Sequence, residues 1–129
     1  MDTSAYSHFM RNDKEVVNLM SRARDVAVPA VVLGELRTGF RRGRRADENE
    51  GHLQRFLANT AVRVLTVDDE ASRRYAEIMS DLLTRGSPVP TNDVWIAAVA
   101  SRDGYTVVTY DDHFLRISRV GVNVLRTSS

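Results

Sequence analysis

Apolar residues recur along the chain with two different periods. In the segment 14–23, apolar positions follow helical spacing, whereas residues 26–28, 62–67, 105–110 and 122–126 are short β-branched or apolar runs typical of strands. Helical spacing returns in the segments 30–40, 46–58, 69–85 and 92–102. Strands separated by helices predict βαβ units, and therefore an α/β fold with a central, mainly parallel β-sheet flanked by α-helices.

Several residues mark where these elements end. Asp68 is placed as the N-cap of the helix after 62–67, and Pro29 suits the first turn of the helix 30–40. The segment 85–91 carries one glycine and two prolines and is predicted to be a loop, and the helix 92–102 should end at Gly104. A short helical turn is expected around Phe114 and Ile117.

Length and composition fit one soluble domain that spans residues 1–129. Hydrophobic residues make up 43% of the chain and charged residues 27%, which excludes a wholly disordered protein. There is no cysteine, so disulfides and thiolate metal sites are excluded. No signal peptide is visible, and the apolar stretch 26–34 is far shorter than the roughly 20 residues that span a bilayer. We therefore expect a cytoplasmic protein without a membrane segment.

Four acidic residues are predicted to lie at one rim of the sheet, because strand carboxyl ends share an edge with the starts of the following helices. Asp111 follows the strand 105–110, and Glu35 lies in the second turn of the helix after 26–28. Asp93 lies at the start of the helix 92–102. It reaches the rim only if the loop 85–91 places the start of that helix there. Asp2 stands where a first strand would end.

Each acid also has a purely structural explanation. Asp93 would be stabilised by the helix dipole as an N-cap or first-turn residue, and Asp111 could start a turn. Asp2 could be a loose terminal residue. Glu35 lies beside an apolar helical stripe, where it could pair with an arginine in the core or serve in a site. Carboxylates that converge repel one another, and a divalent cation with oxygen ligands, Mg²⁺ or Mn²⁺, would offset that repulsion.

Four segments in order resemble a PIN-domain ribonuclease, most closely the VapC toxins of bacterial toxin–antitoxin pairs. They are MDTSAYS (1–7), VLGELRTG (32–39), PTNDVWIAA (90–98) and VVTYDDHF (107–114). The resemblance implies that Asp2, Glu35, Asp93 and Asp111 bind Mg²⁺ or Mn²⁺ and support RNA hydrolysis. It also implies a VapB-type antitoxin and a homodimer or larger assembly. The family spacing favours Asp111 over Asp112, and Thr3, Ser4 and Thr109 are placed to hydrogen-bond these carboxylates.

One departure from the family concerns the N-terminus. Only Met1 precedes Asp2, where the family has a run of apolar residues that forms the central strand. We therefore expect either a very short first strand or a different start, and an Asp2 that is less firmly held than Asp93 and Glu35.

A basic segment follows Glu35. Arg37, Arg41, Arg42, Arg44 and Arg45 could contact RNA or a partner, or could be a solvated helix end. His8, His52 and His113 are scattered, and none is predicted to be a metal ligand. Two other functions stay open: a non-catalytic PIN-like module that binds RNA or protein with an incomplete metal site, and, more weakly supported, a flap-type DNA nuclease.

Overall fold

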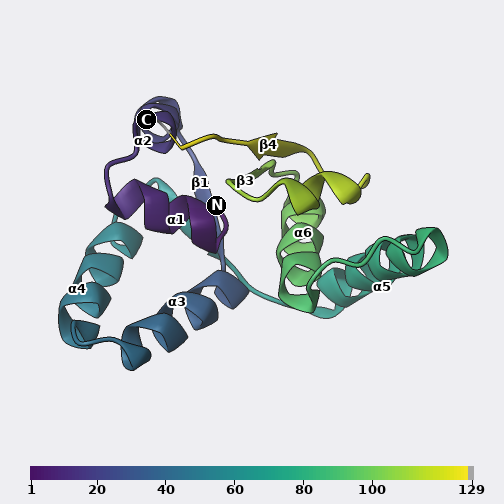
Figure 1. Ribbon diagram of the computed structural model, residues 1–129, viewed down its shortest axis with the longest axis horizontal. Helices are drawn as coiled ribbons and strands as arrows, with labels where there is room; N and C mark the ends of the chain where they lie inside the picture. Colours follow the sequence, from purple (N-terminus) through teal and green to yellow (C-terminus); the bar gives the residue numbers. More distant parts are fainter. Residues whose placement is uncertain (128–129) are drawn as a thin grey trace.

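The computed structural model describes residues 1–127 and contains helices and strands in alternation (Figure 1). In chain order they are α1 (Thr3–Met10), α2 (Lys14–Arg22), β1 (Val26–Pro29), α3 (Ala30–Arg42), α4 (Ala46–Leu57), β2 (Val62–Leu65), α5 (Asp69–Arg85), α6 (Thr91–Asp103), β3 (Val107–Thr109), the 3₁₀ helix η1 (Asp112–Arg116) and β4 (Val122–Val124). Every element that the sequence predicts is present within a few residues, and α1 is an additional helix that it does not predict.

Helix ends follow the expected chemistry. The Asp68 carboxylate accepts a hydrogen bond from the Ala71 backbone N–H, which confirms Asp68 as the N-cap of α5. Helix α6 ends at Gly104, whose φ of 75° lies in the left-handed region that glycine adopts without strain. Pro29, expected in the first helical turn, is the last residue of β1 and directly precedes α3.

The strands form two parallel pairs. β1 pairs with β2, from Val26 opposite Val62 to Pro29 opposite Leu65, and β3 pairs with β4, from Val107 opposite Val122 to Thr109 opposite Val124. The parallel α/β arrangement is thus confirmed. The sheet, however, is not continuous: the two pairs are separate.

The first two residues bridge the two strand pairs. The Met1 amino group donates a 3.1 Å hydrogen bond to the Ala27 carbonyl of β1, and the Asp2 N–H donates a 3.1 Å bond to the Val108 carbonyl of β3. Burial lowers the pKa of the Met1 ammonium to about 6. The neighbouring space between β1 and β3 is an apolar cavity of about 290 Å³. These two hydrogen bonds connect β1 to β3 at the position that a complete first strand would occupy.

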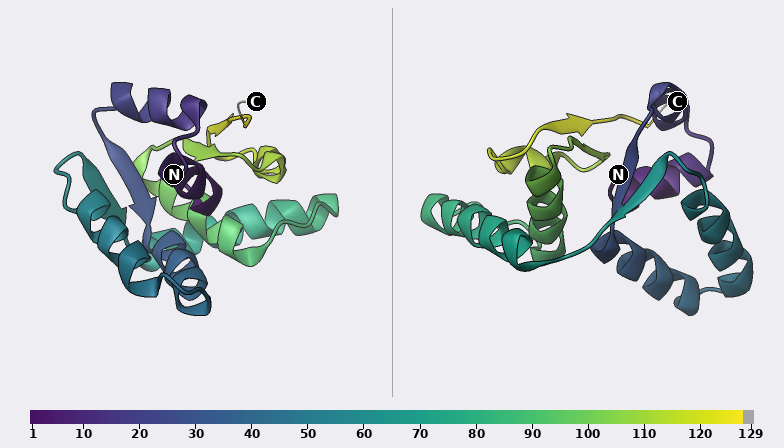
Figure 2. Two further views of the ribbon diagram at one scale, coloured as in Figure 1. Left: turned by 60° about the vertical axis from the view of Figure 1, so that its left-hand side comes forward. Right: turned by 180° about the vertical axis from the view of Figure 1, so that it is seen from behind.

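Two helical groups flank these strands (Figure 2). Helices α1, α3 and α4 contact one another on one side, while α5 and α6 pack together on the other, with α6 also touching β1 and β3. Six consecutive or near-consecutive residues of α6 are buried: Val94, Ile96, Ala97, Ala98, Val99 and Ala100. Helix α6 is therefore the central core helix. No helix within residues 1–127 is long and apolar enough to cross a membrane.

The end of α6 is tied to the start of α5 by a buried arginine. The Arg102 side chain is 8% exposed and donates to the Thr66 carbonyl, to Asp68 and to both oxygens of Asp103 at 2.7–2.9 Å. Hydrogen bonds from Arg102 are the main reason that the pKa of Asp103 is lowered. This contribution to stability is present above about pH 4 and is lost as the pH falls through the lowered pKa.

We predict that Arg102→Met lowers the free energy of unfolding by about 1–3 kcal/mol, because three acceptors lose a charged donor. Urea denaturation at pH 7 measures it. The matched control is Arg73→Met, which removes an ion pair to Asp69 whose side chains are 75% and 80% exposed. That change should stay below about 0.5 kcal/mol. If the two substitutions lowered the free energy of unfolding equally, the hydrogen bonds of Arg102 would not have the stabilising role given to them here.

Candidate functional site

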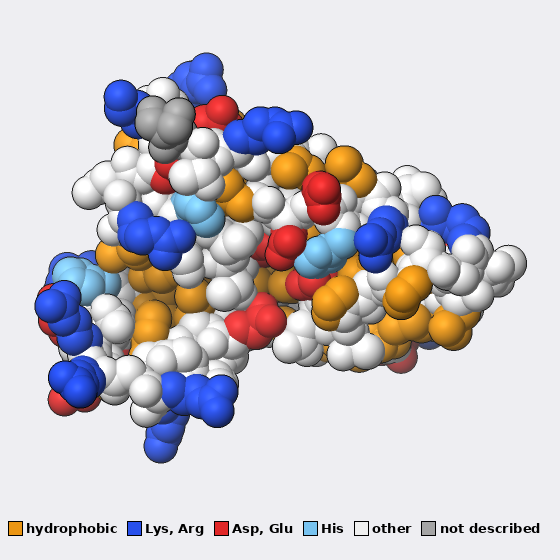
Figure 3. Space-filling view, in the orientation of Figure 1, with side chains coloured by type: hydrophobic (Ala, Val, Ile, Leu, Met, Phe, Trp, Pro, Cys, Tyr) orange, Lys and Arg blue, Asp and Glu red, His pale blue; other side chains and the backbone are white. Residues whose placement is uncertain are grey.

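The four acids that the sequence places at one rim line a single pocket of about 470 Å³. Its walls are Asp2, Thr3, Ser4, Glu35, Pro90, Thr91, Asn92, Asp93, Asp111 and His113. In Figure 3, acidic side chains gather around a hollow near the middle of the face, between the two helical groups. Asp112 is not part of this wall and lines a neighbouring pocket instead. The preference for Asp111 over Asp112 is thus consistent with the geometry.

Asp2 is the most deeply placed of the four, with 4% of its surface exposed. One carboxylate oxygen, Oδ1, accepts from the Ala5 backbone N–H at 2.9 Å and from the Ser4 hydroxyl at 2.8 Å. The other, Oδ2, accepts from the Thr109 hydroxyl at 2.6 Å. Asp2 is therefore held firmly as the N-cap of α1, contrary to the expectation that it would be held less firmly than Asp93 and Glu35.

Glu35 projects from the second turn of α3, and its two hydrogen bonds among the described residues go to neutral side chains. Its Oε1 accepts a 2.6 Å bond from the Thr3 hydroxyl, and its Oε2 accepts a 3.4 Å bond from the Asn92 amide. Both partners are neutral, so the carboxylate charge is not cancelled. Within residues 1–127 the core ion pair that the sequence leaves open for Glu35 is not formed, and the residue lines the pocket instead.

Asp93 is the third residue of α6, after Pro90 at the N-cap position. Asp93 is therefore a first-turn acid and not the N-cap, which is one of the two alternatives that the sequence leaves open. The helix dipole favours a negative charge at this position. Burial raises the pKa of Asp93, and the charges of Glu35 and Asp2 add to this effect, while the hydrogen bond to His113 opposes it. The shift upward comes mainly from burial of this carboxylate, and the neighbouring acids make the smaller contribution.

Asp111 lies just after β3, with its side chain 55% exposed. Its backbone N–H donates to the Thr109 hydroxyl at 2.9 Å, so one threonine contacts both Asp111 and Asp2. Its Oδ1 lies 3.3 Å from His113 Nδ1, while His113 Nε2 lies 2.5 Å from Asp93 Oδ2. One imidazole thus connects two of the four acids.

The donor chemistry of the pocket fits a hard divalent cation. Four carboxylates line it, and none of the lysines or arginines within residues 1–127 does. Oxygen-only donors select Mg²⁺ or Mn²⁺. In the described part of the chain no three acidic or histidine side chains converge on one point, and Thr3 and His113 each contact a carboxylate oxygen of the pocket. The four acids nevertheless line the same pocket.

A sequence profile of the PIN domain matches residues 1–120. The chain belongs to the PIN-domain family. Ribonuclease VapC5 of Mycobacterium tuberculosis is 34% identical over 102 residues, which are 78% of this chain and 76% of that protein. Toxin FitB of Neisseria gonorrhoeae is 32% identical over 119 residues, 86% of each chain. The resemblance that the four sequence segments indicate is thereby confirmed.

A solved structure supports the same fold for this PIN domain. VapBC2 from Rickettsia felis, in a crystal with a DNA fragment from its promoter, contains a chain that superposes with a TM-score of 0.88. The match covers 97% of this chain and 96% of that one, at 21% sequence identity. At this identity the likeness shows the fold alone.

The basic segment lies at the far end of α3 from the acidic pocket of the PIN domain. Figure 3 shows its basic side chains at the lower left, over the turn between α3 and α4. Arg37 is bound to Glu50 through two 3.0 Å hydrogen bonds, whereas Arg41, Arg42, Arg44 and Arg45 are exposed. A role in RNA contact stays a prediction for this segment, and Arg37 is the least available of the five.

Among the pocket residues that the sequence does not predict, Asn92 and His113 contact the acids directly. Asn92 directly precedes Asp93 and contacts Glu35, and His113 follows Asp111 by two positions and contacts both Asp111 and Asp93. The only signal in the sequence is closeness to a predicted site residue. Whether such a neighbour faces the site depends on the turn, and η1 turns His113 inward.

We predict that Thr109→Val destabilises the PIN domain by about 1–3 kcal/mol, because the contacts of a fully buried hydroxyl with Asp2, Asp111 and Ser4 are lost while the side-chain shape is kept. Thermal or urea unfolding measures the change. The control is Thr38→Val, whose exposed hydroxyl bonds only the Gly34 carbonyl of its own helix. A Thr109 variant as stable as the Thr38 variant would show that Asp2 does not depend on this bond.

Proposed function

We propose that this chain is a VapC-type toxin, an endoribonuclease that hydrolyses RNA phosphodiester bonds with the aid of Mg²⁺ or Mn²⁺. The observation that carries the proposal is the meeting of four carboxylates from four distant segments in one pocket of a PIN fold. The VapC5 and FitB relatives, named as a ribonuclease and a toxin, support it. The solved VapBC-5 complex of Mycobacterium tuberculosis, which contains a chain 34% identical to this one, supports a VapB-type antitoxin as the partner.

In this mechanism the protein supplies the oxygen ligands and their fixed positions. A bound divalent cation would lower the pKa of an attacking water and offset charge on the phosphate. Asp2, Glu35, Asp93 and Asp111 would bind the cation. Thr109 and Ser4 orient Asp2, and Thr3 orients Glu35. Because Asp93 stands on the buried α6, its oxygens cannot move far as the cation binds.

The first test replaces single acids. Asp93→Asn removes one negative ligand while keeping the side-chain size, so we expect Mn²⁺ binding measured by calorimetry to weaken at least about tenfold. RNA cleavage should fall by about 100-fold or more. Asp111→Asn should act in the same direction. The matched control is Asp112→Asn, adjacent in sequence but outside this pocket, which should retain both properties.

Equal RNA cleavage by the wild type and Asp93→Asn would refute the enzymatic proposal. Absence of Mn²⁺ binding by the wild type would favour the other candidate, a non-catalytic PIN-like module that binds RNA or protein. The observation that favours this candidate is that, within residues 1–127, no three acidic or histidine side chains are arranged so that they could hold a metal ion.

The exposed arginines yield a separate prediction about RNA affinity. In the cleavage-deficient Asp93→Asn background, Arg44→Ser combined with Arg45→Ser should weaken RNA binding. Each lost phosphate contact should also reduce the slope of log affinity against log salt by about 0.7. Fluorescence anisotropy at several salt concentrations measures this. Arg73→Ser, on the exposed face of α5, is the control. An unchanged slope would remove this segment from the RNA contact.

We propose a second groove as the contact surface for the antitoxin. Helices α1, α3 and α4 enclose a space of about 260 Å³ whose walls include Tyr6, Met10, Leu36 and Phe40. The Tyr6 hydroxyl is buried without a hydrogen-bond partner among residues 1–127. A homodimer and a cytoplasmic location belong to the same proposal, and sedimentation of the purified chain would test the dimer.

A further inference from the structure

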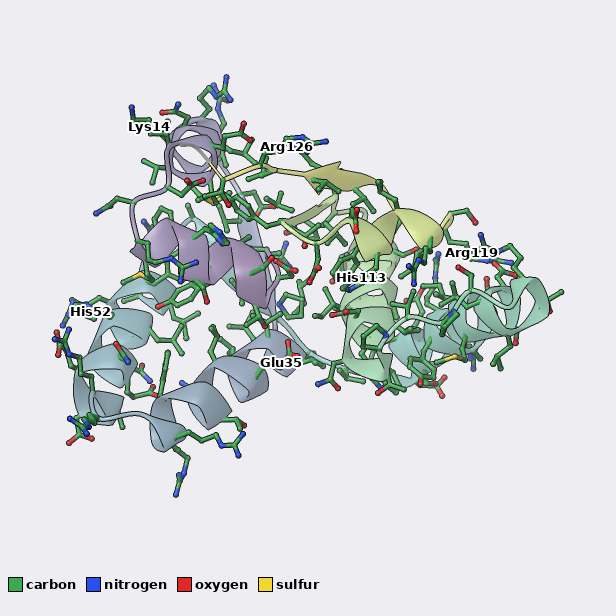
Figure 4. The ribbon with its side chains drawn as sticks, viewed as in Figure 1. Lys14, Glu35, His52, His113, Arg119 and Arg126 are labelled. Carbon is green, nitrogen blue, oxygen red and sulfur yellow. The ribbon has the colours of Figure 1, made fainter. Side chains whose placement is uncertain are left out.

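One imidazole bridges two acids of the pocket. His113 approaches Asp93 Oδ2 at 2.5 Å through Nε2 and Asp111 Oδ1 at 3.3 Å through Nδ1. Asp93 comes from α6 and Asp111 from the end of β3, and the two lie 18 positions apart in the sequence. In Figure 4, His113 lies on the α6 side of the site and Glu35 on the α3 side. His113 therefore contacts two of the four carboxylates of the pocket, those of Asp93 and Asp111.

Packing fixes the orientation of this ring. His113 stacks on Phe114, with ring centroids 5.3 Å apart and an interplanar angle of 21°. Phe114 is fully buried and anchors η1 in the core. The His113 side chain itself is only 21% exposed. A ring held in this way can fix the separation and direction of the two carboxylates that it contacts.

The other two acids are held in a comparable manner. Asp2 has the hydroxyls of Ser4 and Thr109, and Glu35 has the hydroxyl of Thr3. Asp93 and Asp111 have no such hydroxyl among the bonds that the described residues make, and His113 takes that place for both. A carboxylate has about four lone-pair positions, so one bond to His113 leaves Asp93 Oδ1 and Asp111 Oδ2 for a cation.

We propose that His113 is a positioning residue that holds Asp93 and Asp111 at the spacing required to bind the divalent cation. This rests on the cation site of the proposed function. His113 acts through the two carboxylates and is not itself a ligand. Groups that orient ligating carboxylates commonly change metal affinity about 10–100-fold when they are removed.

The test measures Mn²⁺ binding to the full-length chain by calorimetry, without RNA. We expect His113→Ala to weaken the affinity about 10–100-fold. His113→Gln, whose amide can donate to one carboxylate, should fall between His113→Ala and the wild type. In the Asp111→Asn background the loss caused by His113→Ala should be smaller, because part of its action is already removed and the two changes are not additive.

Leu115→Ala is the matched control for disturbance of η1, because Leu115 belongs to the same turn and is 63% exposed. It should leave Mn²⁺ affinity unchanged. Thermal unfolding of each variant verifies that the chain is folded at the temperature of the titration. An unchanged or tighter affinity in His113→Ala, an equal loss in Leu115→Ala, or no Mn²⁺ binding by the wild type would overturn the proposal.

The outcome is separable from that of the proposed function. A wild type that binds Mn²⁺ but leaves RNA intact would refute the ribonuclease assignment, while the comparison of His113 variants would keep its meaning. Conversely, RNA cleavage by the wild type together with full Mn²⁺ affinity in His113→Ala would uphold the enzyme and reject the positioning role.

Discussion

The attachment of Asp2 is the constraint on which the rest of this structure depends. Its backbone N–H bonds to β3, its carboxylate caps α1, and its second oxygen accepts from Thr109 at the end of β3. The preceding Met1 amino group bonds to β1. Two residues therefore join both strand pairs and the first helix. The same residue carries a carboxylate of the pocket, so the fold and the site share one anchor.

The pocket keeps four carboxylates close together without a lysine or arginine in its wall. Neutral hydroxyls, an amide and backbone N–H groups hold Asp2 and Glu35, and these bonds orient the acids without cancelling their charge. Burial is the main cause of the raised pKa of Asp93, and the nearby charges of Glu35 and Asp2 add to it. A local arrangement of this kind raises the free energy of the metal-free protein, and rigid mounts such as α6 keep the acids from turning away.

Much of this arrangement is predictable from sequence, and the limits have physical causes. The rule that strand carboxyl ends share an edge places Asp111 and Glu35 correctly, because it depends only on chain direction. Helix α1 escapes prediction because 3–10 has a weak apolar period and its stability comes from the Asp2 cap and from burial of Ala5 and Tyr6. The Glu35–arginine pair that the sequence leaves open is not formed within residues 1–127, where Thr3 on that unpredicted helix bonds to Glu35 instead.

The orientation of His113 cannot be predicted from the sequence. Its neighbour Asp111 is identified by spacing, but the side of the chain on which His113 emerges depends on the 3₁₀ geometry of η1 and on the burial of Phe114. Neither depends on the acids themselves. Core packing thus decides which side chain reaches Asp93, and a substitution that alters the packing of Phe114 would alter the site without touching a carboxylate. Stability and chemistry are coupled here through one aromatic contact.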